Sequence, residues 1–131
     1  MKSAQQYINE VRAEIDEISV ENLHTLLSQT ELILIDVREH EEFIAGHILG
    51  AVNFPRGVLE NKLCDHPAVS HHCDSSLALD DLSQRNIYLI CRSGGRSALA
   101  ARSLENMGHS SVLSVAGGMI AWEKSQFPTV I

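Results

Sequence analysis

The stretch from Asn86 to Met107 constrains the fold most, because it passes from a predicted strand directly into a predicted helix. Ile87–Ile90 is a short run of apolar and aromatic residues that favour β-structure, which indicates a buried strand. Ser97–Met107 carries apolar or small residues at helical spacing, which predicts an amphipathic helix. Only a short loop with two glycines separates the two elements. This order of strand, loop and helix is typical of an α/β domain.

The rest of the chain repeats the alternation of strands and helices. Further strands are predicted at residues 31–37, 51–54 and 111–115. Helices are predicted at residues 4–17, 20–29, 39–45, 58–63, 77–82 and 119–124, with Ser19 as the N-cap of the second. The run 31–37 is apolar without alternation, as expected for a central parallel strand that is buried on both faces. We therefore expect one α/β domain whose mainly parallel central sheet has helices on both faces, with an extra N-terminal helix.

Cys91 lies where the predicted strand ends and the loop to the helix begins. Backbone N–H groups and the positive end of the helix dipole meet at such a position, so we expect this thiol to ionise readily. Arg92 and Arg96 flank Gly94 and Gly95 in the same loop, which predicts a nucleophile cradle for an anionic substrate. A structural alternative stands beside it, because a cysteine at a strand end is often a small buried hydrophobe and two glycines are often a simple turn.

The distribution of charge narrows the class of partner. The formal net charge of -7 argues against nucleic acid and against an anionic membrane. Between Asp81 and Glu105 there is no acidic residue, and four arginines lie there: Arg85, Arg92, Arg96 and Arg102. This pattern predicts a cationic patch around the cysteine loop, which favours a small anion.

A second strand end carries charged residues. Asp36, Arg38 and Glu39 lie at the end of the run 31–37 and just beyond it. Ligands of parallel sheets bind outside the carboxyl ends of the strands, so we expect these residues near Cys91, where ion pairs could position its loop. The alternative is that Asp36 and Arg38 form a structural salt bridge.

Residues 64–76 predict a loop that contains several metal-binding residue types: Cys64, His66, His71, His72 and Cys73. Zinc sites usually show closely spaced Cys or His pairs, whereas eight residues separate these two cysteines and a proline interrupts the stretch. We therefore predict a surface loop and no metal site. Three cysteines without framework spacing, and no signal-peptide pattern at the N-terminus, predict a reducing, cytoplasmic compartment.

Four motifs, in order along the chain, resemble those of the rhodanese domain, the thiosulfate sulfurtransferase family. They are Asp36–Glu39 with Glu42 and Phe43 (D-V-R-x-x-x-E-[FY]), Gly46–Ala51 (G-H-I-P-G-A, with Leu49 in place of proline), the loop Cys91–Ser97, and Gly117-Gly118 with Trp122 (G-G-x-x-x-W). The resemblance covers nearly all of the chain beyond the first helix. It divides the chain into an N-terminal helical extension, residues 1–16, and a rhodanese-like domain, residues 17–131.

The resemblance implies sulfur transfer through a persulfide on Cys91, without a cofactor. The donor would be thiosulfate or a persulfide, and the acceptor would be cyanide, a thiol or a protein thiol. The loop from Arg92 through Ser93, Gly94, Gly95 and Arg96 to Ser97 would bind the substrate. Arg92 is the candidate that steers the anionic donor. For Arg96 we favour a bracing role, through a pair with Asp36 or Glu39, over direct binding.

Two alternatives remain within the same fold. Rhodanese-like domains include phosphatases and arsenate reductases, whose loop is one residue longer. Here four residues separate Cys91 from Arg96, a ring better suited to a sulfur atom than to a phosphoryl group. The other alternative is a non-catalytic module for partner binding or sulfur sensing. Such modules commonly lose the cysteine, which this chain retains.

Overall fold

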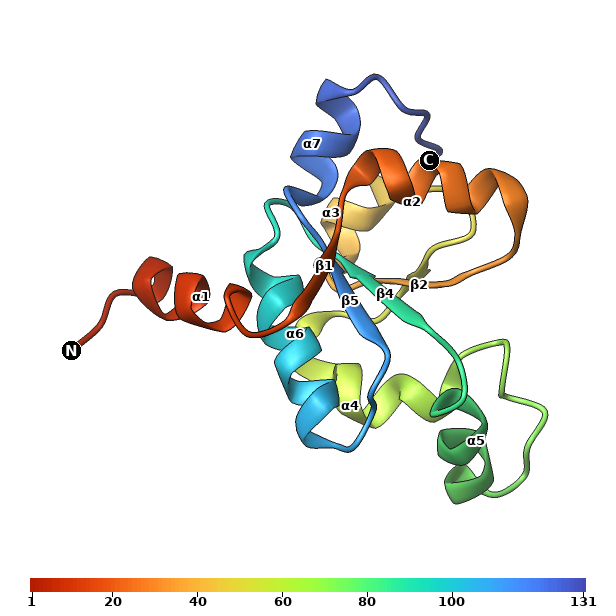
Figure 1. Cartoon of the computed structure of the whole chain (residues 1–131). Helices are drawn as coiled ribbons and strands as arrows, with labels where there is room; N and C mark the ends of the chain where they lie inside the picture. Colours follow the sequence, from red (N-terminus) through yellow and green to blue (C-terminus); the bar gives the residue numbers. More distant parts are fainter.

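A central sheet of five parallel strands organises the computed structural model, which describes residues 1–131 (Figure 1). The strands are β1 (Asp16–Ile18), β2 (Ile33–Asp36), β3 (Val52–Asn53), β4 (Ile87–Ile90) and β5 (Val112–Val115). Their order across the sheet is β1-β5-β4-β2-β3, so β4 and β2 are inner strands. The predicted parallel sheet is confirmed, and the residues that follow β2 and β4 meet at one edge of it.

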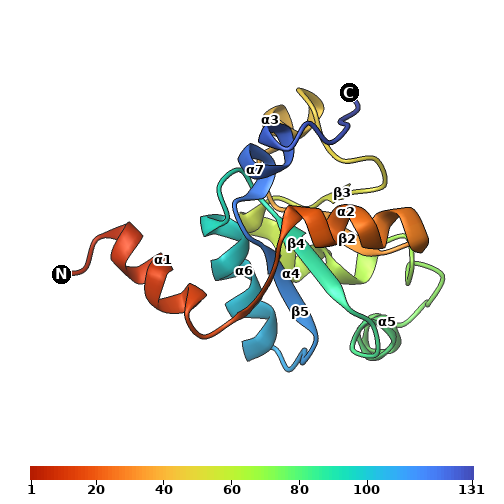
Figure 2. The ribbon, with the colours of Figure 1, turned by 45° about the horizontal axis from the view of Figure 1, so that its top comes forward.

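Helices cover both faces of the sheet (Figures 1 and 2). The helical elements are α1 (Ala4–Arg12), α2 (Val20–Gln29), α3 (His40–Ile44), η1 (Arg56–Val58), α4 (Leu59–Lys62), η2 (Leu63–Asp65), α5 (Ser75–Leu82), α6 (Gly95–Asn106) and α7 (Gly118–Lys124). Alternate residues of each strand serve the two layers. Ile87 and Leu89 pack with residues of α4, α5 and α6, whereas Tyr88 and Ile90 pack with residues of α2 and α7. The two layers explain why the inner strands read as continuous apolar runs.

The first helix is shorter than predicted. The apolar spacing predicts a helix over residues 4–17, but α1 ends at Arg12 and the chain then forms β1, which the sequence analysis missed. β1 pairs in parallel with β5, with Asp16 opposite Leu113 and Ile18 opposite Val115. The backbone N–H and C=O groups along the edge of β5 are free to pair with a further strand. This pairing favours a strand at residues 16–18 more strongly than the apolar spacing of Ile15 and Ile18 favours a helix. Helix α1 lies against α6 (Figure 1), and Val11 and Ile15 at this contact are buried in the core.

The other predicted elements are present, with boundaries that differ by a few residues. Ser19 caps α2 through a hydrogen bond from Asn22 N–H to its Oγ at 3.1 Å. Helix α5 begins two residues before the predicted start, because the side chain of Asp74 caps it through Ser76 N–H. None of the helices combines the length and apolar character needed to cross a membrane.

Candidate active site

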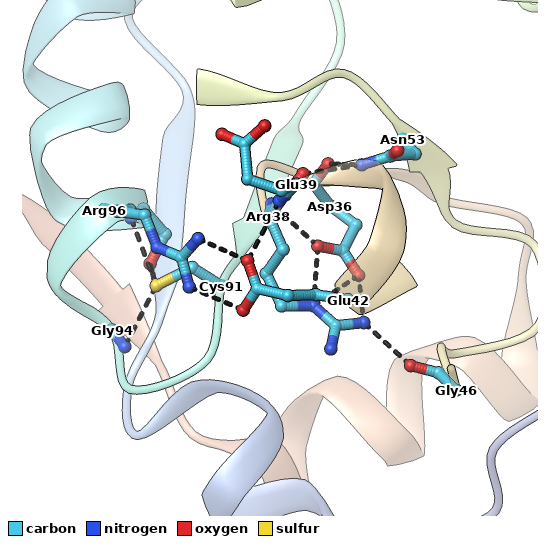
Figure 3. Close-up of polar contacts among 10 residues, drawn as sticks. Asp36, Arg38, Glu39, Glu42, Gly46, Asn53, Cys91, Gly94 and Arg96 are labelled. Atoms are coloured by element: carbon cyan, nitrogen blue, oxygen red, sulfur yellow. Dashed lines mark hydrogen bonds and ion pairs between the residues drawn. The ribbon is translucent and has the colours of Figure 1, made fainter. Parts of the chain in front are cut away.

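β4 delivers Cys91 to the carboxyl edge of the sheet, and the loop that follows surrounds its sulfur (Figure 3). The residue is 1% exposed. The backbone N–H groups of Gly94 and Ser97 donate to Cys91 Sγ at 3.1 and 3.3 Å. Ser97 Oγ lies 3.4 Å from the sulfur, where it accepts from a thiol and can donate to a thiolate. Two backbone donors, joined by the Ser97 hydroxyl once the thiol has ionised, thus surround one sulfur atom, an arrangement that stabilises a sulfur anion.

Ser97, which lies beside the sulfur, is hydrogen-bonded to a second serine on β5. Ser97 Oγ lies 2.8 Å from Ser114 Oγ, which β5 contributes, and both residues are fully buried. When Ser97 donates to a thiolate, its oxygen can accept a hydrogen bond from the Ser114 hydroxyl. The two hydroxyls then form a hydrogen-bond chain that ends at the Cys91 sulfur. Ser114 is a residue that the sequence analysis missed, and nothing in the local pattern distinguishes it from another strand residue.

Helix α7 fixes the end of β4. Met119 N–H donates to Cys91 O at 2.8 Å, and Ile120 N–H donates to Arg92 O at 3.0 Å. The approach is close enough to require glycine at position 118, since a Cβ there would lie 2.3 Å from Cys91 O. Gly118 also has a positive φ of 54°. The double-glycine motif is therefore part of the site, because it lets α7 dock directly on the cysteine loop.

Arg96 forms an ion pair with a residue outside the loop, although with a different partner from the one expected. Its two terminal nitrogens donate to the two carboxylate oxygens of Glu42 in α3, at 2.7 and 3.0 Å (Figure 3). The expectation that Arg96 pairs with Asp36 or Glu39 was wrong. The hydrogen bond from Arg96 lowers the pKa of Glu42 to about 2, and the same bond raises the pKa of Arg96. Glu42 was quoted in the first motif, but the sequence analysis gave it no role.

Asp36 and Arg38 form a buried salt bridge with each other, which is the structural alternative for these two residues. Arg38 donates to both carboxylate oxygens of Asp36, at 2.8 to 3.1 Å, and to Gly46 O at 2.8 Å. Asn53 Nδ2 ties the two backbone carbonyls together, at 3.0 Å for Asp36 and 2.9 Å for Arg38. Neither side chain bonds the cysteine loop. The backbone N–H of Glu39 donates to Glu42 Oε1 at 3.0 Å, so this segment contacts the cysteine loop only through Glu42.

The predicted cationic patch is reduced in the folded chain. Carboxylates from elsewhere pair with three of the four arginines: Asp81 with Arg85, Glu42 with Arg96, and Glu14 with Arg102. Arg92 makes no ion pair, and it is exposed together with Ser93 at the rim of the loop. The free positive charge beside Cys91 is therefore that of Arg92.

A cavity of about 830 Å³ lies away from Cys91 and does not include it. Its lining comes from the opposite edge of the sheet and the neighbouring loops, and includes Ile33, His66, Arg85 and Asn86. We identify the site from the convergence of donors on the sulfur, and not from cavity size.

Comparisons with known proteins show which family the chain belongs to. Residues 19–125 match the model of the Rhodanese-like domain family. The chain is 36% identical to thiosulfate sulfurtransferase 16 of Arabidopsis thaliana over 115 residues, which cover 86% of this chain and 90% of that protein. It superposes on the thiosulfate sulfurtransferase of Pseudomonas aeruginosa with a TM-score of 0.78 at 20% identity, over 97% of this chain and 22% of that one. At that identity the superposition shows the shared fold.

Some curated relatives are much longer than this chain. The chain is 32% identical to the adenylyltransferase and sulfurtransferase uba4 of Pyricularia oryzae over 83% of its length, but it spans only 24% of that protein. It spans 58% of the putative sulfur carrier protein YrkF of Bacillus subtilis, at 32% identity over 93% of this chain. The name of the first of these relatives includes sulfurtransferase, and the name of the second describes a putative sulfur carrier.

Proposed function

Because the chain belongs to the rhodanese-like domain family, whose relatives support sulfur transfer in general, we propose that it is a sulfurtransferase that carries a sulfane sulfur on Cys91. The observation that carries this proposal is the convergence of Gly94 N–H, Ser97 N–H and Ser97 Oγ on Cys91 Sγ. A buried sulfur that accepts from two backbone N–H groups and lies beside a hydroxyl is suited to hold negative charge before and after transfer.

The proposed reaction has two displacement steps. The Cys91 thiolate attacks the outer sulfur of thiosulfate, a new sulfur–sulfur bond forms, and sulfite leaves with the electron pair of the bond that breaks. Cys91 is then an anionic persulfide. An acceptor thiolate, or cyanide, attacks the terminal sulfur, and the Cys91 thiolate leaves as the persulfide bond breaks. A persulfide donor would enter the first step in the same way, with its thiolate as leaving group.

The remaining loop residues have distinct proposed roles. Arg92 is exposed and unpaired, so it attracts and orients the anionic donor. Ser93, Gly94 and Gly95 supply the backbone that curves around the sulfur, and Gly94 adopts a φ of 97° that favours glycine. Arg96, with Glu42, holds the loop against α3. Asp36, Arg38 and Glu39 support α3 from the neighbouring strand end.

The proposed partners follow from the size and charge of the site. The donor is a small sulfur anion, and the acceptor is a small thiol or a protein thiol that reaches the rim near Arg92. The three free cysteines accord with a reducing, cytoplasmic environment.

The geometry gives less support to the two alternatives. A phosphatase loop needs its arginine turned toward the anion, whereas both oxygens of Glu42 occupy Arg96 here. A non-catalytic module has no need for two backbone donors and a hydroxyl around one sulfur.

Intact-protein mass spectrometry tests the proposal directly. Incubation with thiosulfate should add one sulfur atom to the wild-type chain, and cyanide should remove it. Cys91→Ser should gain no sulfur. The control Cys64→Ser/Cys73→Ser should gain it as the wild type does, because the remaining cysteine is the one in the cradle. Sulfur gained by Cys91→Ser would assign the transfer to another thiol.

A further inference from the structure

A cluster of metal-binding side chains lies at the other end of β4, away from the cysteine loop (Figure 1). His71, His72 and Asp81 each offer a ligand atom, and these atoms lie within 4.8 Å of one another. The sequence analysis included His71 and His72 in the loop that it tested, and predicted no metal site from the spacing of the cysteines and the interrupting proline. It did not connect the two histidines with Asp81, which lies outside that loop. Cys64 and Cys73 take no part in this cluster.

From this cluster we propose a binding site for a divalent transition-metal ion, with zinc as its representative, formed by His71, His72 and Asp81. Two imidazole nitrogens and a carboxylate oxygen are a donor set that such ions accept. At usual zinc bond lengths of about 2.0–2.2 Å, ligand atoms in a tetrahedron lie roughly 3.4 Å apart. His72 Nε2 and Asp81 Oδ2 are 2.9 Å apart, so entry of the metal replaces their hydrogen bond and separates them slightly.

The two segments that supply the ligands are anchored in the core. His72 N–H donates to Val69 O at 3.2 Å, and Val69 is fully buried. Asp81 lies in α5 directly before the buried Leu82. The backbone positions of His72 and Asp81 are therefore set by folding, and binding requires little reorganisation of either.

Second-sphere contacts also favour coordination. Arg85 Nε donates to Asp81 Oδ1 at 3.0 Å, which orients the carboxylate and leaves Oδ2 directed at His72. Such outer hydrogen bonds fix the direction of a metal ligand. The His71 ring lies beside that of His72, with centroids 4.1 Å apart, and His71 is exposed, so it can adjust to complete the site. Three protein ligands leave one position for water.

A metal ion at this site would link α5 to the loop that precedes it, residues 66–74. An ion that binds only the folded chain raises its stability by mass action. Because α5 precedes β4 and Cys91 follows it, the metal lies apart from the sulfur chemistry. We expect zinc to raise the melting temperature without entering the transfer reaction.

Calorimetric titration of the chain with zinc chloride tests the site. The chain should carry Cys91→Ser, so that the catalytic thiol does not compete for zinc. We expect one zinc ion per chain. Loss of an outer-sphere contact costs roughly 10–100-fold in metal affinity, so His71→Ala or His72→Ala should weaken binding by at least about tenfold. His71→Ala is the cleaner variant, because it preserves the contacts among His72, Asp81 and Arg85.

Two controls separate this site from adventitious binding. His40→Ala removes an exposed histidine elsewhere and should leave the affinity unchanged. Cys64→Ser/Cys73→Ser should also retain binding, and the cobalt form should lack thiolate charge-transfer absorption. Binding that survives His71→Ala and His72→Ala, or that disappears with the two cysteines, would overturn the proposal. So would less than half a zinc ion per chain in the parent.

Discussion

The ends of β4 and β2 lie side by side at one edge of the sheet, yet their polar groups are satisfied very differently. After β2, the carboxylate of Asp36 is fully buried and is bonded by Arg38 through both its side chain and its backbone N–H. After β4, the Cys91 sulfur accepts from two backbone N–H groups, lies beside the Ser97 hydroxyl and makes no hydrogen bond to a charged side chain. The buried Asp36–Arg38 salt bridge has its hydrogen bonds filled and fixes the backbone after β2. The Cys91 sulfur, in contrast, is placed to take on negative charge during a reaction.

Removing the sulfur should produce the largest effect on activity. Cys91→Ala should abolish thiosulfate:cyanide transfer, because no other group at the end of β4 can hold the transferred sulfur. Its melting temperature should stay close to that of the wild type, since alanine fits the space of a small buried side chain. Steady-state assay and thermal melting check the two halves of the expectation. Cyanide-dependent turnover in this variant would contradict the mechanism.

After β2, a substitution should reduce stability much more than activity. Arg38→Met leaves the carboxylate of Asp36 buried without its charged partner, which should lower the free energy of unfolding by about 3–5 kcal/mol. The folded fraction should retain part of its activity, because neither residue touches the sulfur. Urea denaturation gives the magnitude.

The double variant Asp36→Asn/Arg38→Met serves as the control, since it removes the unpaired charge and should recover part of the lost stability. If Arg38→Met were as inactive as Cys91→Ala while remaining stable, the two strand ends would share the chemistry.

The Glu42–Arg96 ion pair links the two regions. Its removal should change the free energy of unfolding by an intermediate amount that depends on pH. The pKa of Glu42 is depressed from 4.5 to about 2 in the folded chain, so its contribution is present above about pH 4.5 and is lost as the pH falls toward 2. Glu42→Gln should lower the free energy of unfolding by about 1 kcal/mol at neutral pH, since solvent screens this half-exposed pair. The variant should also lose less stability than the wild type between pH 5 and pH 2. Denaturation series at several pH values measure this, and parallel curves would exclude the linkage.

The smallest effect on activity is expected for Arg92, at the exposed rim of the cysteine loop. Arg92→Ala should raise KM for thiosulfate by up to about tenfold, which corresponds to about 1.4 kcal/mol of binding, with kcat much less affected. Raising the ionic strength should increase KM more in the wild type than in the variant, because salt screens the charge that the variant lacks. The melting temperature should not change, since Arg92 makes no ion pair. An unchanged KM would remove Arg92 from donor binding.

Features with a local cause were predictable from the sequence. The apolar runs of β2 and β4 follow from burial on both faces, and the start of α2 follows from the Ser19 cap. The short distance from β4 to α6 placed Cys91 in a loop at a helix N-terminus. The double glycine before α7 was visible as a motif, although its contact with Cys91 O was not.

Only the tertiary structure decided which distant groups meet. Arg96 reaches Glu42 across 54 residues and Arg102 reaches Glu14 across 88, so a stretch without acids retains one unpaired arginine near the sulfur. β1 exists because β5 offers it a partner, and Ser114 matters because β5 places it behind Ser97. His71, His72 and Asp81 converge through the packing of a loop on α5. Propensity, capping and periodicity act over a few residues, whereas these contacts depend on how strands and helices pack, which no local pattern records.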